Sequence, residues 1–94
     1  MINKIKLKIK NSLELSRKGK KIKINDNNFK ELIKELNSYV DEYSNNKELI
    51  KSNVADTIHY YKTERKIKVG VGRRDDLINT LEFNIDNPNY VRKT

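Results

Sequence analysis

Lysine ammonium groups are the side chains of this sequence whose number and spacing could do chemistry. Lysine occupies every second position near the N-terminus and recurs in two later short segments. An ammonium group contacts a phosphate by charge, and each such contact releases a counterion from a nucleic acid. Lysine lacks the planar fork with which arginine recognises bases, so weak sequence specificity is expected. The predicted nucleic-acid-binding residues of this kind are Lys4, Lys6, Lys8, Lys10, Lys21, Lys23, Lys66 and Lys68.

A glycine and arginine segment is a second candidate for anion binding. Gly70 and Gly72 are followed directly by Arg73 and Arg74. Glycines before a helix can expose backbone amides to a phosphate, and two arginines could clamp it. The alternative is a turn in which the arginines pair with the aspartates that follow. The segment is neither a Walker sequence nor a full dinucleotide fingerprint. We add Arg73 and Arg74 to the predicted site.

His59 is the only histidine, and the sequence has no cysteine. A helical wheel places His59 away from the apolar stripe around it, so we expect an exposed side chain. One histidine without cysteine cannot provide the ligand spacings of a zinc site, so no metal and no cofactor are predicted. A small basic ribonuclease, with His59 as general base beside Arg73 or Arg74, stays open as an alternative. The preferred prediction is a protein that is not an enzyme.

The net charge of +8 is unevenly distributed along the chain. Residues 1–25 carry nine basic residues and one acid, residues 26–64 carry five and eight, and residues 65–94 carry seven and four. An AT-rich coding sequence would also enrich lysine, asparagine and isoleucine, but it would not sort charges by segment. The basic field should therefore come from the first and last parts of the chain.

The spacing of apolar residues predicts the elements that position these lysines. From Ile5 to Leu15 apolar residues fall on odd positions, with lysines between them, which is the period of a strand with one buried face. Gly19 can supply a hairpin turn, and Ile22 and Ile24 then lie on a second strand. In this hairpin Leu15 would lie opposite Ile22. The lysines would share the outward face of a sheet.

The middle of the chain has helical spacing. Asn25–Asn28 is a helix-start signal, in which Asn28 and Glu31 have the spacing of a capping box. Apolar residues over 29–43 and 50–61 form two amphipathic stripes joined by a short polar loop, which predicts an αα-hairpin. Period two returns over 65–71 and predicts a third strand. After Gly72 the pattern suits either a helix or a strand, and it ends at Pro88.

These elements define an α+β fold of order ββααβ with an ambiguous final helix or strand. An antiparallel sheet, made of the N-terminal hairpin and a strand near 65–71, would be covered on one face by the αα-hairpin. Residues 1–86 are predicted to form a single basic domain and 87–94 an extended C-terminal tail. A chain this short buries a small core, which a homodimer could complete. It shows no membrane-spanning run and no secretory signal, so a cytoplasmic location is predicted.

The preferred function is non-enzymatic binding of DNA or RNA by the lysine-rich sheet face. The alternative is a small inhibitor or adaptor of phage or mobile-element type that docks on a protein or a nucleoprotein complex. In a further alternative, the order basic strand, helix, helix over 20–64 resembles a ribbon-helix-helix DNA-binding dimer. The resemblance implies that Lys21, Lys23 and Asn25 face a DNA groove. The strands expected before and after this region depart from that plan.

Overall fold

The computed structural model describes residues 2–65, 67–69 and 73–91. This part of the chain contains four helices, α1 (Ile2–Lys18), α2 (Asp26–Glu42), α3 (Lys47–Thr63) and α4 (Arg73–Asp86). Two strands of two residues each, β1 (Ile22–Lys23) and β2 (Lys68–Val69), pair in antiparallel fashion. The fold is therefore mostly helical, and the predicted α+β fold is wrong.

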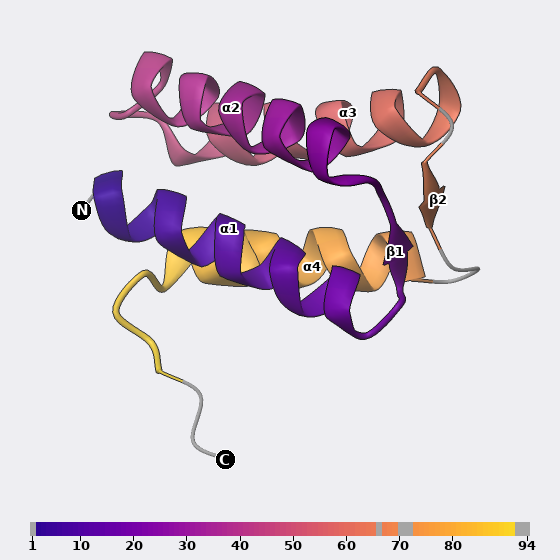
Figure 1. Ribbon diagram of the computed structural model, residues 1–94. Coiled ribbons are helices and arrows are strands. Elements are labelled where there is room, and N and C mark those ends of the chain that lie inside the picture. The colour runs from indigo at the N-terminus through magenta and orange to yellow at the C-terminus, as the bar shows by residue number, and fades with distance from the viewer. Residues whose placement is uncertain (1, 66, 70–72, 92–94) are drawn as a thin grey trace.

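Successive helices run in opposite directions and form two layers, α1 with α4 and α2 with α3 (Figure 1). Each helix contacts its two neighbours, so α1 packs on α2 and α4, and α3 packs on the same two helices. This is an up-and-down arrangement of four helices around one core. The α1–α2 and α3–α4 connections meet at one end of the molecule, where β1 and β2 pair (Figure 1).

The predicted N-terminal hairpin is wrong, because residues 2–18 form a helix. Ile5, Ile9 and Leu13 are four residues apart, so the core stripe of a helix contains all three, and each is at most 2% exposed. Leu7 and Leu15 would join them on a strand, but on α1 they are 56% and 65% exposed. A helix satisfies its own backbone hydrogen bonds, whereas a long strand needs an equally long partner, and β1 has only two residues.

Among the described residues, the only strand pairing joins β1 to β2. Its register places Ile22 opposite Val69 and Lys23 opposite Lys68. Leu15 is therefore not the partner of Ile22, and the predicted three-stranded sheet does not form. Of the third strand expected over 65–71, the described residues form strand at β2 alone.

The prediction of two central helices is confirmed by α2 and α3. The cap of α2 lies earlier than predicted, because the Asn25 side chain accepts a hydrogen bond from the Asn28 backbone amide at 2.8 Å. Asn46 caps α3 in the same way, accepting from the Leu49 amide at 3.1 Å. These contacts satisfy backbone donors that each first turn leaves free.

The element after Gly72, ambiguous in sequence, is the helix α4. Leu77, Leu81 and Ile85 are four residues apart and buried between α1 and α3. The α1–α4 contact includes a hydrogen bond of 2.5 Å that the Asn84 side-chain amide donates to the Ser12 hydroxyl. The chain continues past α4 with Pro88 buried, so the start of the predicted tail packs against the helices.

Candidate nucleic-acid interface

The first four predicted lysines lie on α1 and do not share one face. Successive residues of a helix are rotated by about 100°, so residues two apart lie on widely different sides. Lys4 and Lys8 lie toward α4 and the segment after it, whereas Lys6 and Lys10 lie toward α2. The predicted common lysine face of a sheet is therefore wrong.

Three of these four lysines already have partners within the chain. Lys4 donates a hydrogen bond to the Asn89 side-chain oxygen at 2.5 Å, and Lys8 donates to the Tyr90 carbonyl. Lys6 forms an ion pair of 2.5 Å with Asp41 of α2. These contacts hold α1 to its neighbours and reduce the capacity of the three ammonium groups to bind an external anion.

Other predicted lysines do meet, at the end of the molecule where the strands pair. Lys21 and Lys23 flank the buried Ile22, so both side chains point to solvent. Lys68 of β2 lies directly opposite Lys23 and is also exposed. Two segments that are far apart in sequence thus present their ammonium groups together.

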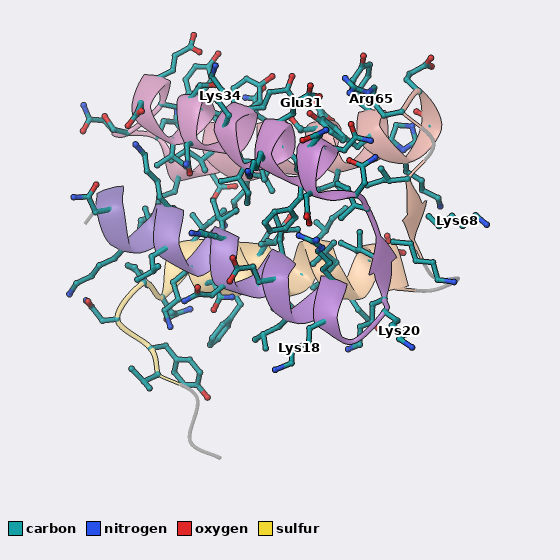
Figure 2. The ribbon with its side chains drawn as sticks, in the orientation of Figure 1. Lys18, Lys20, Glu31, Lys34, Arg65 and Lys68 are labelled. Carbon is teal, nitrogen blue, oxygen red and sulfur yellow. The ribbon has the colours of Figure 1, made fainter. Side chains whose placement is uncertain are left out.

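The end of α1 adds two lysines that the sequence analysis missed. Lys18 is the last residue of α1, and Lys20 lies in the turn that leads to β1. Figure 2 shows Lys20 and Lys68 projecting outward at this end of the molecule, and Lys18 projecting downward from the last turn of α1. We define the basic end as the five exposed lysines Lys18, Lys20, Lys21, Lys23 and Lys68.

The ion pairs found in the described part of the chain involve other cations than the lysines of the basic end, such as Arg17 with Asp26. Asp76 lies near one member of the basic end, because it lines a small pocket together with Lys21. Lys23 and Lys68 are like charges on directly opposed residues, which destabilises a strand pair by a few tenths of a kcal/mol.

Lys20 is held in a backbone conformation that usually belongs to glycine. Its φ is 61°, the left-handed region, which costs a residue with a Cβ roughly 1 kcal/mol. The Lys20 amide donates to the Arg17 carbonyl at 3.1 Å and the Lys21 amide to the Ser16 carbonyl at 2.9 Å. This is the Schellman pattern that ends a helix. Glycine stands one position earlier, so the sequence analysis placed the turn residue at Gly19, whereas the left-handed residue is Lys20.

Helix dipoles contribute little net potential to the basic end. Two helices, α1 and α3, end there, and two, α2 and α4, begin there (Figure 1). Their partial charges of opposite sign largely offset one another. Asp26, Asp75 and Asp76 lie in the first turns of α2 and α4, where a carboxylate is favourable. The charge at this end therefore comes from side chains, namely the five lysines of the basic end and these three aspartates.

The structure tests the remaining site predictions only in part. Lys66 lies outside the described residues, as do Gly70 and Gly72. Arg73 and Arg74 begin α4, and only their backbone is described. The predicted exposure of His59 is confirmed on α3.

The described residues contain no cluster of histidine and acidic side chains that could hold a metal ion. None of the described helices has the length and apolar character needed to cross a bilayer.

Comparison with known proteins found no relative of this chain. No family model, no curated protein and no solved structure matches the chain.

Proposed function

We propose that this protein binds nucleic acid through its basic end, by contacts with the phosphate backbone and without catalysis. The observation that supports the proposal is that five exposed lysines from two distant segments gather there, and none of them takes part in the ion pairs found among the described residues. A phosphate backbone would neutralise them and release its counterions.

Two features of the basic end oppose stability and support a role in binding. Lys23 and Lys68 repel each other, and Lys20 occupies a strained conformation that glycine would relieve. Local strain of this kind is frequent at functional sites, where a side chain is retained for its activity. A solubilising surface would not require lysine at a left-handed position.

The shape of the basic end favours a duplex. A two-stranded ribbon fits the major groove of B-form DNA, whereas the major groove of A-form RNA is too deep and narrow. All members of the basic end are lysines, which provide charge rather than an aromatic surface on which single-stranded bases stack. We therefore expect duplex DNA to bind more tightly than duplex RNA or a single strand.

Fluorescence anisotropy with labelled duplex and single-stranded DNA and RNA tests the proposal. At low salt, micromolar binding of the duplex is expected, and four or five phosphate contacts predict a slope of roughly −4 in a plot of log affinity against log salt. The informative variant is Lys23→Gln/Lys68→Gln, which should lower the magnitude of the slope by about 2.

The matched control is Lys4→Gln/Lys47→Gln, because it removes the same charge at the opposite end of the helices. This control should lose little affinity. Equal losses in the two variants would show that net charge alone matters. Absence of binding to every probe at low salt would refute the function itself.

A small adaptor that docks on another protein is the second candidate. It is favoured by large apolar side chains that are exposed on α1, α4 and the segment after α4, namely Leu7, Leu15, Phe83, Tyr90 and Val91. Binding through such residues changes little with salt, whereas phosphate binding weakens steeply. A complex that survives high salt and is lost in Leu15→Gln/Phe83→Gln would support this function, and a salt-labile complex would exclude it.

A further inference from the structure

A groove of about 520 Å³ lies between α1 and α2, along residues 29–41 of α2. Its volume is within the range of small-molecule sites. From α1 the groove is lined by Lys10. From α2 it is lined by Phe29, Lys30, Ile33, Lys34, Asn37, Ser38 and Asp41. In Figure 1 these two helices lie in front of the other pair.

Ion pairs between α1 and α2 close both ends of this groove. Lys6 and Asp41 meet at 2.5 Å at one end. At the other end Arg17 pairs with Asp26, and its guanidinium lies 4.9 Å from the centre of the Phe29 ring. The two helices are antiparallel, so these ion pairs lie at opposite ends of the groove.

Between these two ion pairs, lysines line the groove from both helices. Lys10 lines the groove from α1, and Lys30 and Lys34 line it from α2. None of the three is in an ion pair found among the described residues. Lys30 and Lys34 are also four residues apart on one helix, where like charges destabilise by a few tenths of a kcal/mol. The one carboxylate that lines the groove among the described residues, Asp41, is paired with Lys6, so the lining charges outside the ion pairs found there are positive.

The wall beneath these ammonium groups is apolar. Phe29 is 7% exposed, and Ile33 is half-buried and packs against the core. An apolar wall removes water from one side of a ligand, which strengthens the charge contacts on the other side. We propose that the groove binds an organic anion that combines a flat or aliphatic body with two or more negative charges. Inorganic phosphate lacks such a body, and a neutral ring lacks the charges.

Amide NMR titrations with ADP, pyrophosphate and adenosine separate the two requirements. ADP should bind at least about tenfold more tightly than either of the others and shift the amides of Lys10 and of residues 29–38. Lys34→Gln should weaken ADP binding several-fold, and Lys47→Gln should leave it unchanged. Equal affinity for ADP and pyrophosphate, or shifts confined to the basic end, would overturn the proposal. Naphthalene disulfonate is a second probe, because it is a flat ring with two negative charges. If neither ADP nor naphthalene disulfonate binds, the proposal is also overturned.

Lys34→Glu provides an independent test. It places a carboxylate near Lys10 and Lys30 but also near Glu31 and Glu35, so the unfolding temperature should change little while ADP binding is lost. A lower unfolding temperature would show that Lys34 has a structural role and would contradict the proposal. Duplex DNA binding through the basic end should change little in Lys34→Gln, so the two sites can fail separately.

Discussion

Replacing Lys68 by glutamate should stabilise the fold and weaken nucleic-acid binding at the same time. Lys68 lies directly opposite Lys23 in the β1–β2 pair, and both side chains are exposed. The substitution converts a repulsive cross-strand pair into an attractive one. It also replaces a phosphate-binding charge in the basic end by a charge that phosphate repels.

The magnitude of each effect follows from the position of the pair. Cross-strand charge pairs contribute roughly 0.2–1 kcal/mol, and solvent screens this exposed pair, so a gain of about 0.5 kcal/mol is expected. For a chain of this size that gain raises the unfolding temperature by about 2–4 °C. Loss of one phosphate contact should lower the magnitude of the salt slope by about 1, and the affinity about tenfold at low salt.

Two assays in the same low-salt buffer measure the two effects. Circular dichroism follows thermal unfolding, and fluorescence anisotropy measures the binding of duplex DNA. Lys47→Glu is the matched control, because it makes the same charge change at the beginning of α3, far from the strands. This control should lose much less affinity. A lower unfolding temperature in Lys68→Glu would refute the assigned strand register. Unchanged DNA binding, or an equal loss in the control, would refute the basic end as the interface.

Three further predictions concern the fold. Lys20→Gly should stabilise by about 1 kcal/mol in urea unfolding, since glycine adopts the left-handed conformation freely, and should weaken duplex binding. Leu81→Ala, at a side chain 0% exposed, should cost about 3 kcal/mol, whereas Leu15→Ala, 65% exposed, should cost under about 0.5. Burial, followed by the charge of Glu35, raises the pKa of Tyr61 to about 12, whereas an unfolded tyrosine titrates near 10. The unfolded chain therefore loses this proton first, and stability should fall between those pH values in the wild type more than in Tyr61→Phe.

The central helices could be predicted because their sequence signals are local and unambiguous. Apolar residues three and four apart define one stripe on each helix, and asparagines cap both starts. The ambiguity after Gly72 had a physical cause, because Leu77, Leu81 and Ile85 suit both periods. Contact with α1 and α3 selects the helix.

The N-terminal segment was assigned wrongly because positions four apart satisfy both periods. Ile5, Ile9 and Leu13 share a face on either a strand or a helix, and only Leu7 and Leu15 distinguish the two. The alternation of lysine with leucine and isoleucine favoured a strand. A strand of that length had no partner, since β1 pairs over two residues with β2. A helix needs no such partner, because its backbone hydrogen bonds form within the helix.

The sequence alone determined the amount of positive charge, the segments that carry it and the two central helices. Which lysines share a surface was decided only by the tertiary structure. A helix turns residues two apart to nearly opposite sides and so disperses Lys4, Lys6, Lys8 and Lys10, whereas two connections that meet at one end bring Lys23 and Lys68 together across 45 residues of chain.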